Sequence, residues 1–130
     1  MIAADGPERR HALKVCALAM GLGDKGVSLL YERVLRKEMS KIWVEREAQI
    51  SGVLEVLERE RAAIATPYWF GAAIGHADIA VACVLRFTGE AHPALFDGAR
   101  YPVLAAHGAA CEALPVFLEI KQALAPPSGD

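Results

Sequence analysis

Apolar residues recur at helical spacing along most of the chain, and the first such pattern begins after Asp5-Gly6-Pro7, a plausible cap with proline near the first turn. Its apolar positions follow one another at spacings of three and four, which is typical of one helix face. They are Leu13, Cys16, Ala17 and Met20, followed by Val27, Leu30, Tyr31, Val34 and Leu35. Glycines at positions 21, 23 and 26 weaken this helix, so we expect a kink or a locally thin surface there.

A second helix is predicted to start at Ser40, whose hydroxyl can cap it. Its apolar stripe comprises Trp43, Ile50, Val53, Leu54 and Leu57. The many charged residues between these positions, up to Arg61, are predicted to lie mostly on a solvated face. Residues 65–75 then form a loop with three consecutive aromatic residues at 68–70, and we expect this loop to tuck back against the domain.

The third helical segment runs from His76 to about Phe87 and is apolar on nearly all sides, which predicts a place at the centre of the domain. Two further helices open at Tyr101-Pro102 and Leu114-Pro115, and the tail 126–130 is expected to fray. No β-alternation, repeat or internal boundary interrupts this order. The sequence therefore predicts a single all-α domain over residues 1–130, a bundle of about five helices.

Composition narrows the classes of partner. The chain has 130 residues, 54% of them hydrophobic, which suffices for one core and excludes a disordered chain. A formal net charge of −2 argues against a nucleic-acid binder. The longest apolar stretch, Ile79 to Leu85, is too short to cross a bilayer, and the N-terminus lacks the apolar segment of a signal peptide. Three widely separated cysteines suit a reducing compartment, so we expect a cytoplasmic protein with no nucleic-acid or membrane partner.

The segment from Ile74 to Ile79 carries the most informative local signal. With Gly75 as the N-cap, Asp78 is the third helical residue, and its carboxylate can reach back to the Gly75 backbone N–H. Ile74 and Ile79 occupy the two positions of a hydrophobic staple. A buried catalytic carboxylate is the alternative, but the cap uses Asp78 fully, so we interpret these four residues as structural.

Candidate metal and nucleophile residues are sparse. His107 and Cys111 are four residues apart, half of a possible metal site, but no second pair accompanies them, so we expect no metal. Cys83 lies in the most apolar helix, where a thiol is inert, and Cys16 and Cys111 are expected in the core. We therefore assign no catalytic residue and no cofactor to this chain.

Several segments taken together resemble the C-terminal helical domain of bacterial cytosolic glutathione transferases. The resemblance covers residues from about Pro7 to about Leu124, and one of its most specific parts is the Ala-Asp-Ile sequence after a tryptophan-containing loop. The segments are Gly21-Leu22-Gly23-Asp24-Lys25 with Tyr31-Glu32-Arg33, Trp43 with Arg46, Ile50, Leu54, Leu57 and Glu58, Tyr68-Trp69-Phe70-Gly71, Gly75-His76-Ala77-Asp78-Ile79-Ala80, and Tyr101-Pro102-Val103-Leu104. The family usually has Ser or Thr where this chain has Gly75, so one of two reciprocal cap bonds is absent.

The resemblance implies that this chain lacks the N-terminal thioredoxin-like domain, which in that family binds glutathione as co-substrate. It implies that the helical half contributes part of the wall of the electrophile pocket, for which Met20, Gly23, Asp24 and Val27 are the candidates by position. We expect a chain that is inactive alone and that partners a thioredoxin-like domain or a second subunit, including a homo-oligomer. The alternatives are a non-catalytic protein-interaction module or a ligand carrier of the same fold.

Overall fold

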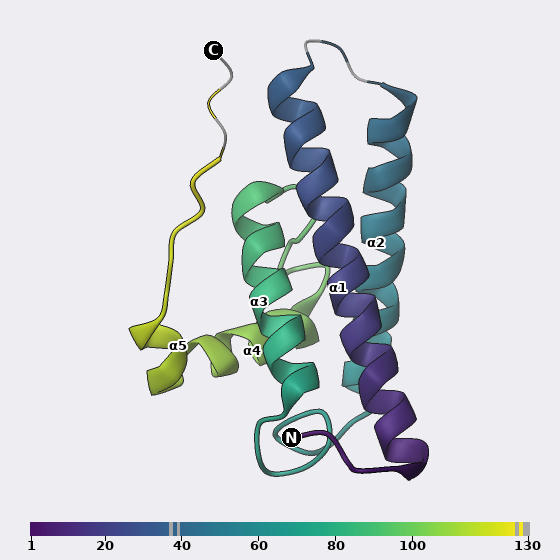
Figure 1. Cartoon of the computed structure of the whole chain (residues 1–130), viewed down its shortest axis with the longest axis vertical. Helices are drawn as coiled ribbons and strands as arrows, with labels where there is room; N and C mark the ends of the chain where they lie inside the picture. The colour runs from purple at the N-terminus through teal and green to yellow at the C-terminus, as the bar shows by residue number, and fades with distance from the viewer. Residues whose placement is uncertain (37, 39, 127, 129–130) are drawn as a thin grey trace.

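The structure is a computed structural model that describes residues 1–36, 38, 40–126 and 128. The described residues form a bundle of five helices with no named strand, which confirms the all-α prediction (Figure 1). The helices are α1 (Gly6–Leu35), α2 (Lys41–Ala62), α3 (His76–Ala91), α4 (Pro102–Glu112) and α5 (Pro115–Glu119). Most of the tail expected to fray, at 127 and 129–130, lies outside the described residues.

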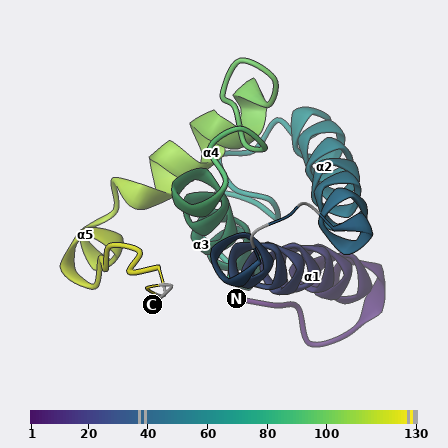
Figure 2. The same ribbon diagram turned by 90° about the horizontal axis from the view of Figure 1, so that it is seen from above.

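The two longest helices, α1 and α2, lie side by side, and α3 packs against α1 (Figure 1). Seen from above, α3 lies between α1 and α4, while α5 lies at the far side of the molecule from α2 (Figure 2). The core lies between α1, α2 and α3 and is closed by Trp69, Tyr101 and Leu104. The α2 stripe is confirmed, because Ile50, Leu54 and Leu57 have no exposed surface.

The apolar face of α1 that the spacing groups together is not the side that packs into the bundle. The side chains that point into the bundle are smaller and lie one position away, namely Ala12, Val15, Ala19, Leu22, Gly26 and Leu29. Five residues of that apolar face are exposed, with exposed fractions from 43% to 65%: Leu13, Met20, Val27, Tyr31 and Leu35. Because α1 carries apolar residues on two sides, the spacing of these residues does not tell which side is buried. Small residues decide the choice, since they let a neighbouring helix approach closely.

The expected kink at the α1 glycines is also absent, since α1 is unbroken over 30 residues. Two of the three glycines face α3 instead. A Cβ atom at Gly23 would lie 3.1 Å from Val84 Cγ2, and one at Gly26 would lie 2.8 Å from Phe87 Cε1. The thin surface of α1 at these two positions is therefore occupied by α3, whereas a Cβ at Gly21 would meet nothing within 4 Å.

Helix α3 differs from its prediction in length and in burial. It continues to Ala91 because the backbone N–H of His92 still bonds to Thr88 O. It is not buried on all sides. Val81 and Leu85 lie in the core, but Cys83, midway between them in the sequence, is exposed. One flank of α3 is thus left for the C-terminal part of the chain.

Candidate functional site

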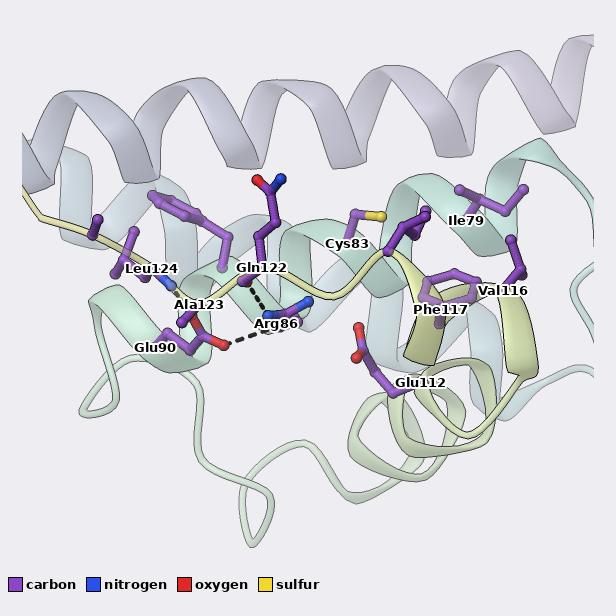
Figure 3. A pocket seen from close by; sticks show the side chains of 13 residues that line it. Ile79, Cys83, Arg86, Glu90, Glu112, Val116, Phe117, Gln122, Ala123 and Leu124 are labelled. Atoms are coloured by element: carbon purple, nitrogen blue, oxygen red, sulfur yellow. Dashed lines mark hydrogen bonds and ion pairs between the residues drawn. The ribbon is translucent and has the colours of Figure 1, made fainter.

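A groove runs along the exposed flank of α3, beneath the segment that follows α5 (Figure 3). Residues 122–125 of this segment line the groove, and the segment is called the tail from here on. It has a volume of about 600 Å³. Helix α3 supplies its floor, α4 and α5 its end wall, and the tail its outer side. Most of its lining is apolar: Ile79, Cys83, Phe87, Val116, Phe117, Ile120, Ala123, Leu124 and Ala125. A cleft of this size and character is typical of sites for small organic ligands.

Arg86 and Glu90, one turn apart on α3, form an ion pair that binds the tail over this groove. Arg86 Nε donates to Glu90 Oε1 at 3.0 Å, and Arg86 also donates to the carbonyl oxygen of Gln122. In turn, the backbone N–H of Leu124 donates to Glu90 Oε2 at 2.9 Å. The Arg86 hydrogen bond, followed by the Leu124 bond, lowers the pKa of Glu90. These contacts hold the tail at two points, on alternate residues (Figure 3).

A thiol and a carboxylate face the apolar part of the groove. Cys83, predicted to be buried and inert, is exposed here, which corrects its position. Burial of the thiol group, together with the negative charge of Glu112, nevertheless raises the pKa of Cys83, so the thiol stays protonated at neutral pH. Glu112 Oε2 is buried and has no hydrogen-bond partner among the described residues. No pattern in the sequence predicts that Glu112 lines this groove, because the groove exists only where the tail lies over α3.

The four predicted pocket-wall residues of α1 do not form one cavity. Met20, Asp24 and Val27 are exposed, and their spacing of four and three puts them on one side of α1. Gly23 is half-buried and faces Val84 of α3. None of the four is among the residues that line the groove beneath the tail.

Asp78 is fully buried and joins the start of α3 to the preceding loop. Its Oδ2 accepts the Gly75 N–H at 2.8 Å, and its Oδ1 accepts the Trp69 N–H at 2.8 Å. Ile74 and Ile79 both pack against the small cluster of Ala82, Cys111 and Phe117. The bond from Trp69, which lies nine residues away, has no local signal in the sequence.

Arg61 was predicted on a solvated face, and this is wrong, since it is only 8% exposed. Its Nε donates to His107 Nδ1 at 3.2 Å, and its remaining donors reach three carbonyl oxygens of the loop that follows α2. His107 Nε2 lies 3.5 Å from Asp78 Oδ1 and 3.8 Å from Cys111 Sγ. The arrangement resembles a nucleophile, a base and an acid, but burial raises the pKa of Cys111 to about 11. This buried thiol remains protonated, so the network is structural.

Two other kinds of site are absent from the described residues. Across 1–36, 38, 40–126 and 128, no three His, Cys, Asp or Glu side chains gather as metal ligands. Within the same residues, no helix combines the length and the apolar character that spanning a membrane requires.

Comparison with known proteins gives one family. Residues 41–108 match the family model described as glutathione S-transferase, C-terminal domain. A search of curated proteins found no match.

Solved structures agree with the family model. A glutathione transferase family member from Pseudomonas fluorescens Pf-5, with bound S-(propanoic acid)-glutathione, is 31% identical, with a TM-score of 0.80 over 95% of this chain and 62% of that one. A structure of a family member from the same organism with bound glutathione gives 31% identity and a TM-score of 0.81, covering 95% of this chain and 59% of that one. A glutathione S-transferase from Methylobacterium radiotolerans, 22% identical, shares the fold with a TM-score of 0.80, over 95% of this chain and 60% of that one. The chain thus spans about three fifths of the length of these proteins. It belongs to the family of glutathione S-transferase C-terminal domains.

Proposed function

We propose that this chain serves as the helical half of a cytoplasmic glutathione transferase and is inactive without a glutathione-binding domain. In this role it contributes part of the wall of the electrophile pocket and a surface against the second domain or a second subunit. Family membership and the solved relatives with bound glutathione derivatives support the proposal.

The observation that carries the proposal is an apolar stripe along the outside of α1. Leu13, Met20 and Val27 are spaced seven residues apart and exposed, and Tyr31 and Leu35 extend the row. Exposed apolar surface on a soluble helix usually marks an interaction site. We assign the stripe to contact with the glutathione-binding domain. Met20, Asp24 and Val27 are then the side chains on the electrophile, with Gly23 behind them where α3 packs.

The chemistry of the described residues supports inactivity of the chain alone. Conjugation requires a glutathione thiolate, which a positioned donor or a positive environment must stabilise. The pKa values of Cys16, Cys83 and Cys111 are all raised, burial being the largest cause. The buried arginine that could stabilise an anion, Arg61, is already committed to four acceptors.

The stripe is tested by binding of a separately expressed thioredoxin-like domain from the Pseudomonas fluorescens relative. Calorimetry should detect binding to the wild-type chain, and Met20→Glu or Val27→Glu should weaken it at least tenfold, about 1.4 kcal/mol. Leu118→Glu is the matched control, because Leu118 is exposed at 60% but lies on α5. Equal loss in all three variants would remove the stripe from the interface.

A ligand carrier is the second candidate, and the groove beneath the tail favours it. The groove is preformed within this chain and needs no second domain. A carrier would bind an apolar compound without glutathione, whereas a protein-interaction module would bind only a macromolecule through the stripe.

A further inference from the structure

The groove beneath the tail contains three charged side chains, one basic and two acidic. Arg86 and Glu90 neutralise each other and hold the tail, whereas Glu112 has a buried oxygen without a hydrogen-bond partner among the described residues. We propose that this groove binds an apolar small molecule carrying a protonated amine, with the Glu112 carboxylate as its counter-ion. The proposal rests on the second candidate function, the ligand carrier, and names its class of ligand.

The apolar part of the ligand follows from the walls. Ile79 and Cys83 project from α3, and Val116 and Phe117 face them from α5 (Figure 3). Phe87 of α3 also lines the groove. The groove has room for a ligand of one or two rings, and such a ligand would remove apolar surface from water on both sides. The polar groups of the Arg86–Glu90 pair already bond to each other and to the tail backbone, so they do not require a ligand.

The charge of the ligand follows from Glu112. The Glu112 side chain is half-buried, but its Oε2 atom is buried and lacks a partner among the described residues, so the desolvation of that oxygen is not compensated. Within the described part of the chain, the one basic residue that lines the groove, Arg86, is engaged by Glu90 and by the carbonyl oxygen of Gln122. An ammonium group beside Glu112 would supply both the missing charge and the missing donor. A carboxylate ligand would meet repulsion at the same place.

The tail is the route by which the ligand enters. Among the described residues, the hydrogen bonds of the tail to α3 are that of the Gln122 carbonyl oxygen with Arg86 and that of the Leu124 N–H with Glu90. Displacing it uncovers the floor of the groove without disturbing the core, since no tail residue belongs to the core cluster. Cys83 on that floor therefore reports on occupancy.

The test uses three probes that share a naphthalene ring: 1-naphthylmethylamine, 1-naphthalenemethanol and 1-naphthoate. We expect the amine to bind about tenfold more tightly than the alcohol, and the naphthoate more weakly than both, measured by fluorescence at neutral pH. The amine should also slow alkylation of Cys83 by iodoacetamide, read by peptide mass, and leave the rate at Cys16 unchanged. In Glu112→Gln the preference for the amine over the alcohol should disappear, with the affinity for the alcohol retained.

Glu119→Gln is the matched control, since Glu119 is exposed and outside the groove lining, and it should bind like the wild type. Equal affinity of the wild-type chain for amine and alcohol would overturn the ligand class and leave the carrier in place. Failure of all three probes would overturn both, and a preference that persists in Glu112→Gln would remove Glu112 as the counter-ion. If Glu112→Gln does not fold, the probe series and Cys83 protection in the wild-type chain decide alone. None of these measurements involves glutathione, so the transferase proposal stands or falls separately.

Discussion

Arg61 Nε donates to His107 Nδ1 across 3.2 Å and joins α2 to α4 inside the protein. The pair has a counterpart at the other end of the bundle, where Arg33 Nη1 donates to His92 Nδ1 at 3.0 Å. His92 Nε2 in turn donates to Gly26 O of α1 at 2.7 Å. Both histidines are buried, and each must keep Nδ1 unprotonated to accept from its arginine. Protonation of these two histidines at low pH would therefore break two contacts between helices.

The stability of the fold should accordingly fall below neutral pH. Burial, as the largest cause, lowers the pKa of both His92 and His107 below the value of about 6.5 that an unfolded chain shows. The unfolded state thus binds more protons, so stability is complete above about pH 6.5 and is lost as the pH falls toward the folded pKa values. With both sites acting, the unfolding constant should change by up to about 100-fold per pH unit.

Urea midpoints measured from pH 8 to pH 5.5 check this, with His107→Asn expected to reduce the slope by about one proton. His76→Asn serves as the control, because His76 is exposed. A midpoint that does not change over this range would refute the two-histidine account.

Removing the Asp78 carboxylate should be costly. Asp78→Ala leaves the backbone N–H groups of Gly75 and Trp69 without their acceptor, and both bonds are to a charged, buried oxygen. We expect the free energy of unfolding to fall by about 3 kcal/mol. Asp78→Asn keeps one acceptor oxygen and should lose less. Equal urea midpoints for Asp78→Ala and wild type would contradict the structural role.

Two glycines of α1 provide a matched pair. Gly26→Ala should lower the free energy of unfolding by about 1–2 kcal/mol, because its Cβ would lie 2.8 Å from Phe87 Cε1. Gly21→Ala should raise it by about 0.5–1 kcal/mol, since the site is open and alanine favours the helix. Thermal unfolding of both variants compares them directly. The opposite order of stability would show that α3 does not pack on Gly26.

The tail over the groove should control access to Cys83. Deleting residues 121–130 removes the contacts of Gln122 and Leu124, so alkylation of Cys83 and binding of a hydrophobic dye should both increase. Deleting only residues 126–130 leaves both contacts in place and should change neither. Identical alkylation rates in the two truncations would mean that the tail does not cover the groove.

The sequence predicts features whose causes are local. The α2 stripe around Leu54 and the reach of Asp78 to Gly75 both depend on residues within a few turns of one another. The core face of α1 could not be predicted, because both of its sides are apolar and the packing of α3 selects between them. Arg61 and His107 are 46 positions apart, and no local pattern joins them.

The groove could not be predicted from the sequence, for a related reason. Cys83 and Glu112 each look ordinary in the sequence, and only the course of the chain after α5 gives them a common surface. The candidate wall residues Met20, Asp24 and Val27 share a side of α1, and under the proposed function they face a second domain. A site shared between domains cannot be read from one of them.

Glutathione conjugation tests the central claim most directly. The chain alone should conjugate 1-chloro-2,4-dinitrobenzene no faster than the uncatalysed background. The same chain, joined to the glutathione-binding domain of the Pseudomonas fluorescens relative, should conjugate it well above background, and Met20→Ala should raise the KM for the electrophile in that fusion. Turnover by the chain alone, or a folded fusion that binds glutathione yet stays at background, would contradict the account.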